Sequence, residues 1–280
     1  MEKQKRALAI HDISCVGKCS LTVALPVLSA AGIETAVLPT SVLSTHTGGF
    51  TGYTFRDLTS DILPIADHWE ALGLTFDALY TGYLGSFEQV RLVEGLFARF
   101  GENALILVDP VMADHGALYK GFAPDFPAEM ARLCKRADVI VPNLTEAALL
   151  LGEPYVEGPY TREYIAGLLR RLGDAFGGKI ILTGVYFEAT RLGAACFDAV
   201  TGETGFAFHD VVPGYYHGTG DVFGSALLAG LMGGLSHRDA MQVAVDFTVD
   251  SIRLTDPARE PRYGVRFEAA LPGLIKRLAR

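Results

Sequence analysis

The sequence has no apolar run long enough to cross a bilayer, which takes about 20 consecutive apolar residues in a helix. Its first residues, MEKQKRALAIHDIS, begin with charge, but the apolar stretch that follows is short and leads at once to His11 and Asp12. A secretory signal peptide needs a longer apolar region and a small-residue cleavage site. The sequence therefore predicts a cytoplasmic protein that has no membrane partner.

The chain is also short of positive charge. It carries 24 Lys and Arg against 32 Asp and Glu, which gives a formal net charge of −8. A protein that binds a nucleic-acid backbone needs a basic surface, so we expect no nucleic-acid partner.

Cysteine is scarce, with four residues that are scattered along the sequence: Cys15, Cys19, Cys134 and Cys196. No second Cys or His pair is spaced so that it would complete a tetrahedral zinc site. This pattern argues against a structural zinc site and favours free, reduced thiols.

Two common nucleotide-binding fingerprints are incomplete. Residues 173–180, GDAFGGKI, have the glycines and lysine of a P-loop, but Ile180 stands where Ser or Thr must bind magnesium. The segment GTGDVFG has two glycines of the dinucleotide motif, but Phe223 stands where the third is required. These gaps argue against a classical P-loop NTPase and an NAD enzyme.

What the sequence does contain is a regular alternation of short apolar runs and helical stretches. We expect strands at 6–13, 34–44, 76–86, 103–111, 138–143 and 179–185. We expect helices at 21–32, around 67–73, and at 86–101, 126–137, 145–152 and 162–173. Such alternation predicts an α/β fold, with a mostly parallel sheet that helices cover on both faces.

The rhythm changes near the C-terminus. Residues 193–212 read as two strands joined by TGET, an antiparallel hairpin, and the chain from Gly218 onward reads as helical. No repeat, low-complexity tract or Pro/Ser-rich linker interrupts the sequence. We therefore expect residues 1–280 to form one domain.

Polar and glycine-rich segments follow the expected strands. In open α/β sheets, ligands bind outside the carboxyl ends of the strands. The segments HDIS, STHTGGFTG, TGYLGS, DPVMADHG, PNLTE, LTG and HGTGD all stand at such positions. They are expected to build one cleft along one edge of the sheet.

The segment GTGD, residues 218–221, opens a helix of small apolar residues in which Asp221 is the only charged side chain. Gly218, Thr219 and Gly220 would present unpaired N–H groups at the positive end of the helix dipole, which suits an anion. Asp221 would repel a phosphate, but it could take a proton from a hydroxyl that attacks one. Alternatively, Asp221 only caps the helix, and the tetrapeptide alone does not decide.

The ordered motifs resemble those of one known group. GTGD is similar to the ribokinase-like superfamily, and STHTG (44–48), TGYLGS (81–86), DPVMAD (109–114) and PNLTE (142–146) match pyridoxal/pyridoxamine kinases in order. The similarity runs from about Leu8 to the last helices. It implies a three-layer α/β/α sandwich, transfer of a phosphoryl group from ATP to a vitamin B6 hydroxymethyl group, and a homodimer. It also implies Mg²⁺ with ATP and leaves a requirement for K⁺ open.

Carried over residue by residue, the resemblance makes Asp221 the general base and Gly218, Thr219 and Gly220 the anion hole. The residues that it places around ATP and its metal are Asp109, Asp114, Tyr119, Asn143, Glu146, Thr183 and Gly184, with Asp114 and Glu146 on the metal. The residues that it places in the vitamer pocket are Asp12, Ser14, Thr47 and Tyr83.

Some of these residues also have simpler interpretations. Asn143-Leu-Thr-Glu146 fits a helix capping box, and Tyr83 would serve equally as a core residue. Asp109 could cap a turn, while Asp114 and Thr47 could be ordinary loop residues. For a metal, however, a few carboxylates near the phosphates suffice, because Mg²⁺ keeps much of its water.

The chain departs from the family pattern at two positions. Asp12 stands where many pyridoxal kinases have a serine that bonds the pyridine ring, and a carboxylate there would favour a charged form such as pyridoxamine. Gly184 follows Thr183 where a lysine or serine often helps to hold ATP, which puts the nucleotide contact there in doubt.

Two alternatives remain open. A hydroxymethylpyrimidine kinase of the same superfamily usually has cysteine in place of Asp221, so the aspartate weighs against it. A catalytically silent nucleotide- or B6-binding regulator would show a degraded site, whereas the carboxylate and the anion-hole glycines are both present. A sugar kinase is less well supported, because its sugar-binding signatures are missing.

Overall fold

A computed structural model describes residues 3–256 and 261–279. The strands are β1 (Arg6–Val16), β2 (Glu34–Thr45), β3 (Phe55–Asp57), β4 (Ala78–Thr81), β5 (Leu105–Val108), β6 (Ala113–Asp114), β7 (Ala117–Leu118), β8 (Val139–Ile140), β9 (Lys179–Glu188), β10 (Arg191–Asp198) and β11 (Thr204–Asp210). The helices are α1 (Leu21–Ala30), α2 (Thr59–Ala71), α3 (Phe87–Phe100), α4 (Phe126–Cys134), α5 (Leu144–Leu151), α6 (Arg162–Phe176), α7 (Thr219–Met232), α8 (His237–Arg253), α9 (Phe267–Leu278) and a short 3₁₀ turn, η1 (Pro261–Tyr263).

One nine-stranded sheet has the order β11-β10-β9-β8-β5-β4-β1-β2-β3. The six strands from β9 to β2 pair in parallel, while β10, β11 and β3 run antiparallel at the two edges. The prediction of a mostly parallel sheet with an antiparallel hairpin at one edge is confirmed.

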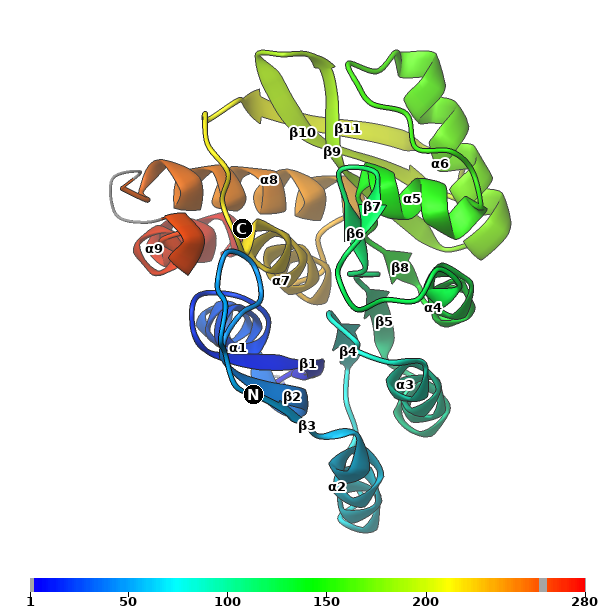
Figure 1. Ribbon diagram of the computed structural model, residues 1–280, viewed down its shortest axis with the longest axis vertical. Helices are drawn as coiled ribbons and strands as arrows, with labels where there is room; N and C mark the ends of the chain where they lie inside the picture. Colours follow the sequence, from blue (N-terminus) through cyan, green and yellow to red (C-terminus); the bar gives the residue numbers. More distant parts are fainter. Residues whose placement is uncertain (1–2, 257–260, 280) are drawn as a thin grey trace.

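Helices cover both faces of the sheet (Figure 1). Successive side chains of a strand point to opposite faces, and β1 shows this directly. Leu8 and Ile10 pack in a core with residues of α2 to α6, while Ala7 and Ala9 pack in a second core with residues of α1, α7, α8 and α9. The expected three-layer α/β/α arrangement follows from these two cores.

The structure differs from the expectation at several strand ends and at some short elements; β4, β5 and β8 are shorter than the predicted strands 76–86, 103–111 and 138–143. β1 and β9 extend beyond the predicted ends, to Val16 and Glu188, so that Ser14 also lies within a strand. The short strand β3 was not predicted. Neither was the β6–β7 hairpin, whose turn is formed by His115 and Gly116 with φ of 50° and 78°, as in a type I′ turn. No helix among the described residues is long and apolar enough to span a membrane.

Candidate active site

Carboxylates from distant parts of the chain meet at the carboxyl edge of the parallel strands. Asp109 follows β5, Glu146 lies in the first turn of α5, and Asp221 lies in the first turn of α7. The charges of Glu146 and Asp221 both act on the ionisation of Asp109. The predicted cleft therefore brings these three acids close together.

Asp12 joins this group from β1. The pairing of β1 with β2 shifts register between His11 and Ile13, and such irregularities redirect side chains beside active sites. Asp12 is buried, the Ser14 hydroxyl donates to its Oδ2 at 3.3 Å, and its charge acts on Asp221. The structure thus places a second acid beside the predicted base.

The N-terminus of α7 differs from half of the other α-helix starts in the described part of the chain, because it has no side-chain cap. Side chains accept hydrogen bonds from first-turn N–H groups in four other helices, through Ser86, Asn143, Thr161 and Ser236. α7 instead begins after Gly218, which has φ of 77° and no side chain to cap the helix. Its first N–H groups are therefore available to an anionic ligand.

Asp221 is half-buried at this uncapped end. Burial raises the pKa of Asp221 to about 7; the backbone N–H of Ser20 opposes this rise, and the negative charge of Asp12 adds to it. An acid that titrates near neutral pH is suited to accept a proton from a substrate hydroxyl. A helix cap alone would not require this environment.

The first turn of α5 holds the β6–β7 hairpin. Asn143 Nδ2 donates to Ala113 O at 2.8 Å, and Thr145 Oγ1 accepts from Gly116 N at 3.0 Å. Glu146 accepts from Met112 N at 3.1 Å and from Asn143 N at 2.9 Å, which completes the capping box with Asn143. The capping interpretation of Asn143 and Glu146 is confirmed, and one turn of helix positions the loop that carries Asp114.

These contacts decide which residues fit a divalent cation. Both carboxylate oxygens of Glu146 already accept backbone N–H groups, and burial raises the pKa of Glu146 to about 8. Asp114 accepts from His115 N at 2.8 Å. The Asp109 carboxylate has no hydrogen bond from any described residue, and burial raises its pKa well above the usual range. A cation nearby would favour its charged form.

No three Cys, His, Asp or Glu side chains of the described residues are arranged to hold a metal by themselves. Mg²⁺ does not need three protein ligands, because it often binds through one or two carboxylates, water and substrate phosphates. A site of this kind is completed by the nucleotide.

Of the other predicted site residues, some lie near the carboxylates and others do not. Tyr83 is half-buried, and both burial and the negative charge of Asp12 raise its pKa. Its ring centroid lies 5.6 Å from that of Phe122. Tyr119 lies near Glu146, Asp114 and Asp109. Thr183 bridges to Asn143, whereas Gly184 (φ 75°) and Thr47 are exposed, and no contact of either with the carboxylates is seen in the described residues.

The segment after β2 contacts the loop before α7, which the sequence did not indicate. His46 is buried; its Nδ1 accepts from Gly48 N at 3.2 Å and its Nε2 lies 2.6 Å from Arg262 O. The His46 and His217 rings are 5.0 Å apart. The segment after β2 is therefore held beside the loop that leads to Gly218, while burial lowers the pKa of both histidines and favours their neutral forms.

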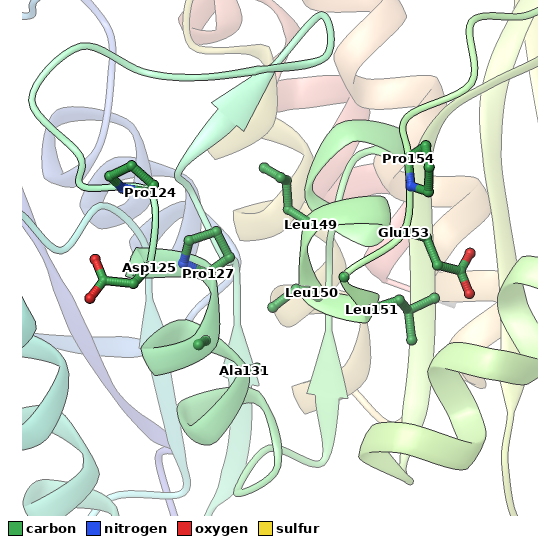
Figure 2. Close-up of a pocket in the computed structure, with 11 residues that line it drawn as sticks. Pro124, Asp125, Pro127, Ala131, Leu149, Leu150, Leu151, Glu153 and Pro154 are labelled. Atoms are coloured by element: carbon green, nitrogen blue, oxygen red, sulfur yellow. The ribbon is translucent and has the colours of Figure 1, made fainter.

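A hollow elsewhere on the surface lies between α4 and α5 (Figure 2). Pro127 and Leu149 are typical of its mostly apolar lining, which includes none of the predicted site residues. The converging carboxylates, and not this hollow, are the candidate active site.

The sequence is similar to those of known kinases. The model of the phosphomethylpyrimidine kinase family matches residues 25–264. The chain belongs to this family. It is 29% identical over 270 residues to a pyridoxine/pyridoxal/pyridoxamine kinase of Bordetella avium, covering 88% of this chain and 86% of that one.

Two crystal structures are similar over nearly the whole length. One is a Bacteroides thetaiotaomicron protein assigned to the phosphomethylpyrimidine kinases and crystallised with pyridoxal, with 38% identity, a TM-score of 0.91, and coverage of 97% of this chain and 96% of that one. The other is a pyridoxal kinase from Lactobacillus plantarum, with 33% identity, a TM-score of 0.90 and coverage of 98% of both chains.

These relatives confirm the resemblance to pyridoxal kinases and the ribokinase-like fold. The protein is a kinase of this family, so its substrates are small molecules and its phosphoryl donor is ATP, used with a divalent cation. The individual roles of the site residues stay predictions.

Thr145 yields a first testable prediction for this kinase. Thr145→Val keeps the side-chain shape but removes the acceptor of the part-buried hydrogen bond from Gly116 N–H, which costs about 0.5–1.5 kcal/mol. We expect a higher KM for ATP with a smaller change in kcat, because the β6–β7 hairpin beside the acids loosens. Steady-state kinetics with varied ATP measure this split.

Thr145→Ser is the matched control, since it keeps the hydroxyl and should stay close to wild type in KM for ATP. Equal KM values for the valine and serine variants would contradict the positioning role of Thr145.

Proposed function

We propose that this kinase phosphorylates the 5′-hydroxymethyl group of a vitamin B6 vitamer, with Asp221 as the general base. The observation that carries the proposal is the half-buried acid in the first turn of an uncapped helix, with a pKa near 7, beside the acids that suit a metal and phosphates. The similarity to a protein crystallised with pyridoxal supports the choice of substrate.

In this mechanism the substrate hydroxyl lies between Asp221 and the terminal phosphate of ATP. Asp221 takes the hydroxyl proton as the oxygen attacks phosphorus, and the bond from phosphorus to the leaving oxygen breaks in line. Gly218, Thr219 and Gly220 form the anion hole. The backbone N–H groups at this start of α7 stabilise the negative charge on the transferred phosphoryl group. The protein's main contributions are positioning and charge neutralisation.

Asp109 and Asp114 are proposed to hold the nucleotide and Mg²⁺, and Glu146 would act on the metal only through water, because both of its oxygens already accept hydrogen bonds. Bound Mg²⁺ would neutralise negative charge on the phosphates. Asn143, Thr183, Gly184 and Tyr119 are proposed to line the ATP site. Asp12, Ser14, Thr47 and Tyr83 are proposed to line the vitamer pocket.

The alternative substrate is hydroxymethylpyrimidine, because the family that the chain belongs to is named for phosphomethylpyrimidine kinase. An assay that couples ADP release to a signal, with pyridoxal, pyridoxamine, pyridoxine and hydroxymethylpyrimidine, separates the two. We expect turnover with the B6 vitamers to exceed that with the pyrimidine at least tenfold in kcat/KM. A preference for the pyrimidine would overturn the substrate assignment, and no turnover with either would favour a silent regulator.

Four further properties are proposed: one domain over residues 1–280 and a cytoplasmic location, both predicted from the sequence, and a homodimer and Mg²⁺ as the natural cation, both implied by the resemblance. A requirement for K⁺ stays open. The continuous sheet supports the single domain, although residues 1–2, 257–260 and 280 lie outside the described residues.

A further inference from the structure

Ser20 has an unusual backbone conformation directly beside the active site. It is buried, precedes α1 as its N-cap, and has φ of 57° and ψ of −129°. Among the described non-glycine residues only Ser20 and His115 have positive φ. Such a conformation costs about 1–3 kcal/mol and persists where the surroundings or the function require it.

The Ser20 hydroxyl is not used in the usual way. Serine at an N-cap normally accepts a hydrogen bond from the first turn of its helix, which stabilises the helix by about 1 kcal/mol. Ser20 forms no such side-chain bond, although its carbonyl still accepts from Val23 and Ala24. The strained backbone therefore does not serve to cap α1.

Ser20 contacts both acids of the substrate side instead. Its hydroxyl lies close enough to Asp12, and its backbone N–H close enough to Asp221, for each of them to favour the ionised form of that acid. Ile13 and Ser20 form an isolated antiparallel bridge, which brings the start of α1 alongside β1. One residue thus links the predicted substrate-binding acid to the predicted base.

Asp12 needs such support because it is buried without a cation of the protein beside it. Burial raises its pKa, and the influences that oppose this rise come from hydrogen bonds of Ser20, Ser14 and its own backbone. No Lys, Arg or His of the described residues forms an ion pair with Asp12 within 4.0 Å. A buried carboxylate in this setting is suited to a cationic ligand.

We propose that Ser20 is a positioning residue that keeps Asp12 in place as the counter-ion of a cationic vitamer, while its N–H orients Asp221. The cation is the protonated amine of pyridoxamine or a protonated ring nitrogen. The inference rests on the proposed function and adds a residue that determines specificity through Asp12.

Ser20→Gly provides a test in which activity and folding move in different directions. Glycine adopts φ of 57° without strain, so the variant should be at least as stable as wild type, and it keeps the N–H that faces Asp221. It loses only the hydroxyl. We expect KM for pyridoxamine to rise roughly tenfold, as for the loss of one hydrogen bond to a charged group, with kcat within about twofold of wild type.

Ser20→Ala is the matched variant, because it loses the same hydroxyl but retains the backbone strain. It should show the same rise in KM with a lower melting temperature than Ser20→Gly. The effect should also depend on Asp12: in an Asp12→Asn background, Ser20→Gly should change KM for pyridoxamine by less than about twofold, because coupled residues are not additive.

Steady-state kinetics with pyridoxamine decide the question, measured for wild type, for Ser20→Gly, Ser20→Ala and Asp12→Asn, and for the double variant of Ser20→Gly with Asp12→Asn. Unchanged KM in Ser20→Gly, or the same rise with and without Asp12, would overturn the role of Ser20 while leaving the kinase assignment intact. A wild-type enzyme that phosphorylates no B6 vitamer would overturn the proposed function and this inference with it.

Discussion

Asp221→Asn is expected to lower turnover by roughly 10²–10⁴-fold, the usual contribution of a general base. Asparagine has nearly the same shape but accepts no proton at neutral pH. The affinity for ATP should stay nearly intact, because Asp221 is placed on the substrate hydroxyl and the Gly218 loop remains. Turnover is measured by coupled ADP release and ATP affinity by calorimetry.

The same substitution should stabilise the protein at alkaline pH. Because folding raises the pKa of Asp221 to about 7, the folded state carries a penalty that grows from about pH 4 and is complete above about pH 7. Asparagine removes this penalty, which amounts to a few kcal/mol at about 1.4 kcal/mol per pKa unit. The melting temperature of the variant should exceed that of wild type at pH 8 and approach it near pH 4. Turnover close to that of wild type would rule out Asp221 as the base.

Gly218→Ala is expected to have the second large effect, on both stability and activity. Gly218 has φ of 77°, and a Cβ there would overlap the carbonyl oxygen of Lys18, a backbone atom that cannot rotate away. The loop before α7 must shift, which would displace the N–H groups proposed to stabilise the transferred phosphoryl group. Loss of such donors lowers kcat by about 10²–10³-fold, which rapid-quench measurement of phosphoryl transfer can detect.

Gly234→Ala separates the clash from the cost of the backbone conformation. Gly234 follows the other end of α7, has φ of 88°, and has no atom within 4 Å of an added Cβ. It should lose about 1 kcal/mol of stability through strain alone and keep its kcat. If Gly218→Ala were no more harmful than Gly234→Ala in melting temperature and kcat, the close approach of Lys18 would not matter.

Much of the fold follows from local pattern. Runs such as 103–111 and 179–185 are apolar enough to be buried on both faces, and helical stretches separate them, so the parallel sheet and its covering helices could be predicted. The β6–β7 hairpin could not. Its two strands have only two residues each, and they depend on hydrogen bonds with Asn143 and Thr145, which lie at the start of α5, far along the chain.

The site could be predicted in its parts but not in its connections. Asp221 and Asp109 stand in recognisable motifs, and the capping box of Asn143 and Glu146 is visible as a spacing. The contact between His46 and His217 leaves no local signal, because it joins segments far apart in the chain. Ser20 resembles an ordinary N-cap, and only its φ reveals a different role.

The pKa of Asp221 could not be predicted from the sequence either. It depends on how deeply the acid is buried and on the proximity of Asp12, which only the packed structure supplies. Local motifs thus indicated which acid to consider, and tertiary structure supplied the environment that suits it to proton transfer at neutral pH.

The pH dependence of the chemical step tests the central claim most directly. Single-turnover transfer from ATP to pyridoxal, measured from pH 5 to pH 9 in wild type and Asp221→Asn, reports the ionisation that the reaction needs. Because the base must be deprotonated, the wild-type rate should rise through about pH 7 and then level off, and the variant should be slow and lack this rise. A rise near pH 7 that persists unchanged in Asp221→Asn would contradict the account.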